Sequence, residues 1–147
     1  MLHKRVERVL PYAPERVFDL AADVERYPEF LRWWIAARVC RREGNICYAT
    51  QTLGLGPIRL RFDSIAVFQR PQRIEVRAKD SFPFREFRII WGFTPAGERD
   101  CRAELAVEFE IAVGPLRSLV EHVTPLAIAD TIAAFETRAR TIYGVLP

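Results

Sequence analysis

The chain has 147 residues, of which 50% are apolar and 28% are charged, a composition typical of globular rather than disordered proteins. This length predicts a single domain, residues 1–147, with one hydrophobic core. The 22 basic and 19 acidic residues are interspersed and leave a net charge of +3, so DNA is not an expected partner. Charged residues interrupt the longest apolar stretch, 116–135, and we expect no membrane span and a cytoplasmic location.

The first third of the chain predicts one strand and two short helices. Residues 3–10 alternate between polar and apolar side chains, which indicates a strand. Pro14 is suited to the first position of a helix, where its missing N–H costs nothing. Asp23 can cap a second short helix over residues 24–30.

From Trp33 onward the apolar period changes to two, which predicts a sheet. Six further strands are expected at residues 35–42, 46–53, 58–70, 73–79, 86–93 and 102–113. The joints between them are short and rich in turn residues, which indicates antiparallel pairing. In the last strand, apolar and charged side chains alternate strictly, so one face of the sheet covers a core and the other faces water.

One long helix is predicted over residues 115–143, with a kink or break near 121–124 because Pro125 lies inside it. This helix is the only long amphipathic element that can cover the concave face of a six- or seven-stranded sheet. If it lies along the sheet without filling the curve, an elongated apolar cavity remains, suited to a hydrophobic small molecule.

The cysteines and polar residues carry no recognised catalytic or metal-binding pattern. The three cysteines lack a CxxC spacing, so neither a disulfide framework nor a metal site is predicted. If Glu43-Gly44 forms the hairpin turn, Cys40 lies opposite Cys47; if Gly44-Asn45 forms it, Cys40 faces Ala49. Neither histidine, His3 or His122, has a nucleophile and base pattern around it. We assign no catalytic residue and no required cofactor, and binding is favoured over catalysis.

Several motifs along the chain resemble a known family. They are Tyr12-x-x-x-x-Val17-Phe18-x-Leu20, Asp23-Val24-Glu25-x-Tyr27-Pro28-Glu29-Phe30-Leu31, Trp91-x-Phe93-x-Pro95, Val107-x-Phe109-x-Ile111 and Ala134-Phe135-Glu136-x-Arg138-Ala139. In this order they resemble the coenzyme Q-binding, polyketide cyclase/dehydrase-like proteins of the START-like (helix-grip) superfamily. The resemblance implies an α+β fold, in which a curved antiparallel sheet of six to seven strands wraps around a long C-terminal helix.

The resemblance also implies a tunnel for a lipophilic ligand, with ubiquinone or a precursor as the leading candidate and a carrier role in respiration. Two alternatives remain open, because fold alone does not select a function. One is a cyclase or dehydratase acting on an aromatic polyketide-like compound. The other is an interaction protein that inhibits ribosomal subunit association, which a contiguous face of Arg59, Arg61, Arg73 and Arg77 would favour.

Candidate ligand-binding residues follow from the inward positions of the expected strands and helix. The expected cavity lining is Trp34, Phe62, Trp91, Phe93, Leu105, Val107, Phe109, Leu119, Val123 and Phe135. The expected cavity mouth, or contact with the inner face of a membrane, is Trp33, Phe82 and Phe84. At most one of the adjacent tryptophans is expected to point inward. Candidate hydrogen-bond donors to a ligand head group are Tyr12, Tyr48 and Thr50.

Overall fold

The computed structural model describes residues 2–78 and 84–144 and shows one antiparallel sheet with helices on one side. The helical elements are α1 (Pro14–Ala22), the 3-10 helix η1 (Val24–Glu29) and α2 (Gly114–Tyr143). The strands are β1 (Leu2–Leu10), β2 (Trp34–Glu43), β3 (Ile46–Leu55), β4 (Ile58–Gln69), β5 (Arg73–Ala78), β6 (Phe84–Pro95) and β7 (Cys101–Ile111). The expected α+β class, element order and helix-grip arrangement are confirmed.

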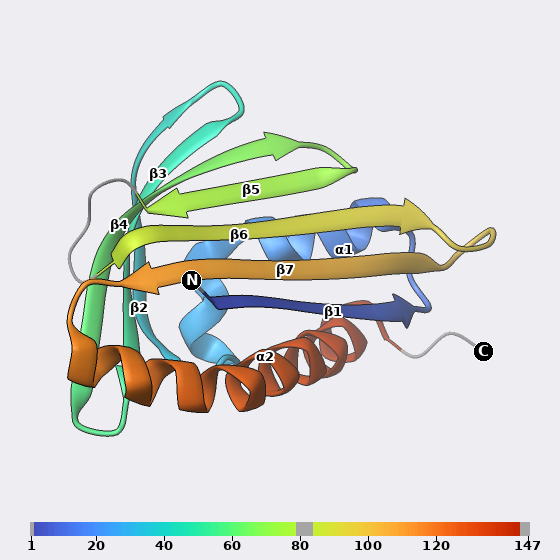
Figure 1. Ribbon diagram of the computed structural model, residues 1–147. Helices are drawn as coiled ribbons and strands as arrows, with labels where there is room; N and C mark the ends of the chain where they lie inside the picture. Colours follow the sequence, from blue (N-terminus) through green and yellow to red (C-terminus); the bar gives the residue numbers. More distant parts are fainter. Residues whose placement is uncertain (1, 79–83, 145–147) are drawn as a thin grey trace.

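The seven strands follow the order β1-β7-β6-β5-β4-β3-β2, so the first strand pairs with the last and every pair is antiparallel. Figure 1 shows the sheet bending around α2, which runs along its border below β1, while α1 lies behind β6 and β7. Because side chains alternate along each strand, the concave face carries the apolar core and the convex face carries most of the charges.

The hairpin between β2 and β3 takes one of the two turns left open by the sequence, but its register differs from the expectation. Glu43 pairs with Ile46, so Gly44-Asn45 forms the turn, with Gly44 at a φ of 58°. A register shift between Val39 and Arg41 places Val39, not Cys40, opposite Ala49. The expectation for Cys40 is therefore wrong by one residue, because a bulge adds a residue to this strand. All three cysteines are free thiols.

Helix α2 continues through Pro125, so the predicted break is absent. Pro125 is exposed, so its ring lies on the solvent side of the helix, and it leaves the Glu121 carbonyl without its usual N–H partner. On the buried side, the Thr124 hydroxyl donates to the Val120 carbonyl at 2.5 Å. Among the described residues, no helix is long and apolar enough to cross a membrane.

Candidate functional site

A cavity of about 150 Å³ lies between the concave face of the sheet and α2. Every strand except β1 contributes side chains to its wall, together with α1, η1 and α2. The wall is mainly aliphatic and aromatic. An apolar cavity of roughly 150 Å³ is large enough for a benzene-sized molecule, so this space accepts one ring but not a long lipid.

Seven of the ten expected lining residues lie in the cavity wall: Trp34, Trp91, Leu105, Val107, Phe109, Val123 and Phe135. The expectation is wrong for the other three. Phe62 is buried, but its ring packs 4.8 Å from that of Phe87 and fills space beside the cavity. Phe93 packs 5.7 Å from Phe18 of α1, and Leu119 is 39% exposed on the outer side of α2.

The residues expected at the mouth occupy different places. Phe84 is 5% exposed and lies in the cavity wall, so it is not available to a membrane. Phe82 lies outside the described residues. Trp33 and Trp34 both line the cavity, although alternation predicted that at most one would. The reason is local, because Trp33 precedes β2 in a turn and is not subject to strand alternation.

None of the expected head-group donors lies in the cavity wall. The Tyr12 hydroxyl donates to the Gly144 carbonyl at 2.6 Å. Tyr48 and Thr50 are on the convex side: the Arg41 guanidinium lies 4.3 Å from the Tyr48 ring centre, and the Thr50 hydroxyl donates to Asp63 at 2.7 Å. These three side chains therefore contact other parts of the fold and not the cavity.

A chain of polar groups crosses the cavity wall instead. The Trp34 indole N–H donates to Gln51 Oε1 at 2.7 Å, and Gln51 Nε2 donates to the Ser64 hydroxyl at 3.0 Å. The Ser64 hydroxyl in turn donates to the Ala49 carbonyl at 3.2 Å. The second N–H of Gln51 Nε2 has no acceptor within the described part of the chain. Sequence reasoning missed this chain, although a polar residue at an inward position of a strand, as at Gln51 and Ser64, is its signal.

Trp33 contributes a different polar group to the same wall. Its indole Nε1 is buried and has no hydrogen-bond partner among the residues that the structure describes. The Arg32 guanidinium lies 4.8 Å from the centre of the Trp33 ring, and Arg32 Nη1 lies 3.6 Å from Asp130 Oδ2 on α2. The Trp33 ring therefore closes the wall between the start of β2 and the middle of α2.

The ionisable groups in the wall are neutral at physiological pH. Burial raises the pKa of the Cys47 thiol, and burial together with the nearby Asp23 charge raises the pKa of the Tyr27 phenol. Among the lining residues that the structure describes, there is no carboxylate and no imidazole. No cluster of described His, Cys, Asp or Glu side chains has a metal-binding arrangement. The wall thus supports binding and hydrogen bonding better than proton transfer.

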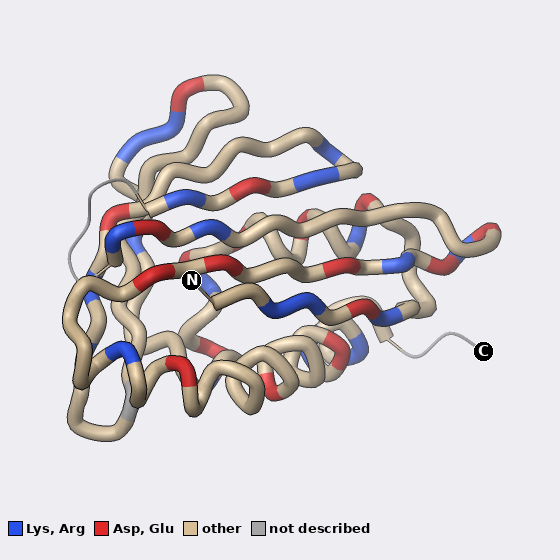
Figure 2. Tube along the Cα trace, viewed as in Figure 1, with Lys and Arg blue, Asp and Glu red and all other residues tan. Residues whose placement is uncertain are grey.

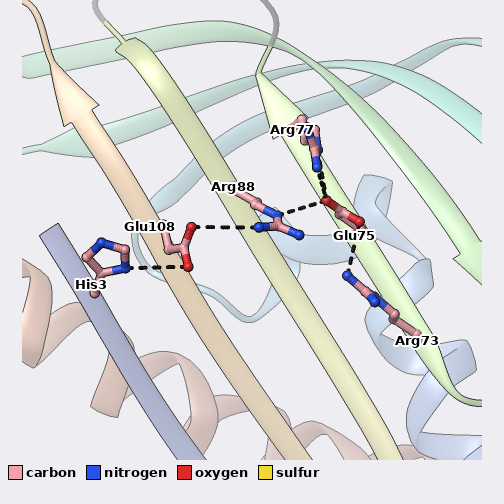
Figure 3. A network of polar contacts seen from close by, with 6 residues as sticks. All are labelled: His3, Arg73, Glu75, Arg77, Arg88 and Glu108. Carbon is pink, nitrogen blue, oxygen red and sulfur yellow. Dashed lines mark hydrogen bonds and ion pairs between the residues drawn. The ribbon is translucent and has the colours of Figure 1, made fainter. Parts of the chain in front are cut away.

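The convex face is a surface of ion pairs. Glu75 of β5 contacts Arg77 at 2.7 Å, Arg88 at 2.8 Å and Arg73 at 3.1 Å, and the chain continues through Glu108 to His3 (Figure 3). Partial burial acts to raise the pKa of Glu75, but Arg77 and Arg88 outweigh it and hold the pKa below its usual range.

The contiguous face of Arg59, Arg61, Arg73 and Arg77 that would favour a ribosome-binding role is not formed. Arg73 and Arg77 share their charge with Glu75, whereas Arg59 donates to the Gly56 carbonyl at 2.6 Å. Figure 2 shows that basic and acidic residues interleave along β5, β6, β7 and β1 rather than gathering by sign. The alternation of side chains along β4 and β5 puts these arginines on the outer face, but the sequence alone does not show which carboxylates pair with them.

Comparison with known proteins identifies a family and several relatives that this chain resembles. Residues 10–136 match the family described as "Polyketide cyclase / dehydrase and lipid transport". The "Ribosome association toxin RatA" of Pseudomonas aeruginosa is 33% identical over 97% of this chain and 98% of its own length. The "Coenzyme Q-binding protein COQ10 homolog B, mitochondrial" of Xenopus laevis is 26% identical over 96% of this chain and 61% of its own.

Among solved structures, TTHA0849 from Thermus thermophilus superposes with a TM-score of 0.85 at 24% identity. The alignment covers 96% of this chain and 99% of that one. At this identity the likeness shows the fold, and the wall of the cavity has to be read from this chain's own residues.

Proposed function

The chain belongs to the polyketide cyclase / dehydrase and lipid transport family, a START-like family, and we propose that it binds a hydrophobic small molecule with an aromatic or quinone ring. The ligand that fits this proposal best is ubiquinone or a precursor of it. In this proposal the protein is a carrier or chaperone of that ligand and supports respiratory electron transport. The observation that carries the proposal is the apolar cavity crossed by the Trp34–Gln51–Ser64 chain.

The size of the cavity limits how much of the ligand can lie inside it. The cavity of about 150 Å³ has room for a single ring, so an isoprenoid tail has to lie outside the cavity or widen it. Burial of apolar area contributes roughly 25 cal/mol per Å², so affinity depends on how much of the tail finds cover. The polar chain supplies orientation, because the spare Gln51 N–H is a donor next to an apolar wall.

The test begins with the protein purified gently from its own cells. Native mass spectrometry, followed by organic extraction, identifies any molecule that stays bound. A stoichiometric quinone or other prenyl lipid supports the proposal. If the protein is empty, titration with ubiquinone bearing a two-unit isoprenoid tail decides the matter, and no saturable binding to the folded protein overturns it.

A second candidate function is association with the ribosome, which the name of the 33% identical relative suggests. The supporting observation here is a group of arginines on β2 and β4, Arg38, Arg59 and Arg61. None of them forms an ion pair within residues 2–78 and 84–144. Unpaired arginines at a sheet surface are suited to phosphate contacts.

Co-sedimentation with purified ribosomal subunits tests this second candidate. Binding that weakens steeply as salt increases, and that Arg38→Glu with Arg61→Glu removes, supports it. Val107→Phe, which narrows the cavity and adds no charge, serves as the control and is expected to keep ribosome binding. No co-sedimentation at low salt contradicts this candidate and leaves the cavity proposal untouched.

A further inference from the structure

Trp33 carries an unused hydrogen-bond donor in the wall of an apolar space. Its indole Nε1 is buried, it has no partner within residues 2–78 and 84–144, and the residue lines the cavity. Nine-tenths or more of buried polar groups in proteins are paired, and leaving a buried donor unpaired is unfavourable. The neighbouring Trp34 shows the usual solution, because its N–H donates to Gln51 at 2.7 Å.

The ring of Trp33 is fixed from two sides. The Gly54 N–H donates to the Trp33 carbonyl at 2.9 Å, which ties this turn to β3. A Cβ at position 54 would lie 2.8 Å from the exposed Ile35 side chain, which would have to shift. On the other side, the Arg32 guanidinium covers the ring and reaches Asp130 of α2. These contacts hold the indole in the cavity wall.

We propose that the Trp33 indole N–H is the polar anchor of the ligand, donating to a carbonyl oxygen on the bound ring. An indole N–H donates and does not accept, so the group that it recognises is an acceptor. The cavity therefore selects carbonyl-bearing rings, such as quinones, by an interaction that a hydrocarbon ring cannot make. This inference rests on the proposed function and specifies the ligand class of the same cavity.

The test uses two probes of the same outline, duroquinone and durene, which share a tetramethylated ring and differ in two carbonyl groups. Each is titrated into the wild-type protein and into Trp33→Phe, which keeps an aromatic wall but lacks the N–H. We expect Trp33→Phe to lower the affinity for duroquinone roughly tenfold and to change that for durene less than twofold. Comparing changes for each probe removes the difference in their hydrophobicity.

Nuclear magnetic resonance adds a readout that a purely structural role does not move. The chain has three tryptophans, and the indole signal absent from Trp33→Phe belongs to Trp33. Duroquinone is expected to shift this signal downfield and durene is not. Equal losses of affinity for both probes, or no loss for either, overturn the anchor while cavity binding stands. No saturable binding of either probe or of short-tail ubiquinone to the wild type overturns the proposed function as well.

Discussion

The two faces of the sheet are built from the same strands but carry different chemistry. On the concave face, Leu105, Val107 and Phe109 of β7 line the cavity, and the polar groups of Trp34, Gln51 and Ser64 bond to one another. On the convex face, Glu104 and Glu108 of the same strand form ion pairs with side chains of neighbouring strands. Adjacent residues thus belong to different functions, and matched substitutions at neighbouring positions separate binding from stability.

The largest expected effect comes from a charge placed on the concave face. Val107 is 9% exposed and lines the cavity, so Val107→Arg fills this space and places a cation in an apolar wall. We expect a loss of affinity for short-tail ubiquinone of at least about a hundredfold, which corresponds to roughly 2.7 kcal/mol or more. Isothermal titration of the folded fraction measures it.

Ala106→Arg is the matched control for this substitution. Ala106 is the preceding residue of β7 and pairs across the sheet with Ile90 and Arg5 on the convex face, so the same side chain enters solvent there. We expect it to keep wild-type affinity. If Val107→Arg does not fold, Val107→Phe narrows the cavity without a charge. Wild-type affinity in both Val107 variants contradicts the placement of the ligand.

The alternation of side chains explains why the fold and most of the wall were predictable. A period of two assigns each strand residue to a face, and this was sufficient for Trp91, Leu105 and Val107. The alternation does not show which inward-facing rings line a cavity and which fill the interior. Phe62 and Phe93 point inward but pack against other rings, because packing depends on residues far away in the sequence.

The polar part of the site was less predictable for a different reason. Tyr48 and Thr50 are candidate head-group donors because they carry hydroxyl groups, but the register of β3 and β4 places them on the convex face. Trp33 lies in a turn, to which neither helical nor strand periodicity applies. Its unpaired N–H is a property of the folded surroundings, and no sequence pattern shows the absence of an acceptor.

The second prediction concerns the aromatic packing of α2 against the concave face. The Phe135 ring lies 5.0 Å from Trp91, 5.1 Å from Phe30 and 5.5 Å from Tyr27. Phe135→Ala removes these contacts and enlarges the cavity, so we expect the free energy of unfolding to fall by about 3–5 kcal/mol. Urea denaturation measures it. A fall below about 1 kcal/mol contradicts the close packing of α2 on the sheet.

The third prediction compares neighbours on opposite faces of β3. Gln51 is 5% exposed and bonds to Trp34 and Ser64, whereas Thr52 is half-buried on the convex side. Gln51→Leu leaves the Trp34 N–H without an acceptor, and we expect a loss of about 1–3 kcal/mol. Thr52→Val is expected to stay within about 0.5 kcal/mol. Equal stability of both variants in urea denaturation contradicts the role of the polar chain.

The smallest effect is expected on the convex face, at the ion pairs of Glu75. Glu75→Gln keeps the size of the side chain and removes the charge shared by Arg73, Arg77 and Arg88. The side chain of Glu75 is 20% exposed, so solvent screens these contacts, and we expect a loss of about 1 kcal/mol at neutral pH. Unchanged affinity for short-tail ubiquinone in this variant is part of the same expectation.

The pH dependence of this difference follows from the lowered pKa of Glu75. Stability from a carboxylate whose pKa is lowered by folding is present above the ordinary carboxyl pKa of 4.5 and is lost as the pH falls through the folded value. Once Glu75 is protonated it resembles glutamine, so the wild type and Glu75→Gln are expected to converge in acid and to differ at pH 7. A difference that is constant across this range in urea denaturation shows that the three guanidinium groups do not stabilise the carboxylate. The convex face then stabilises the fold through its apolar strand contacts alone. In that case its ion pairs contribute nothing to stability, and the two faces differ in role more than those ion pairs suggest.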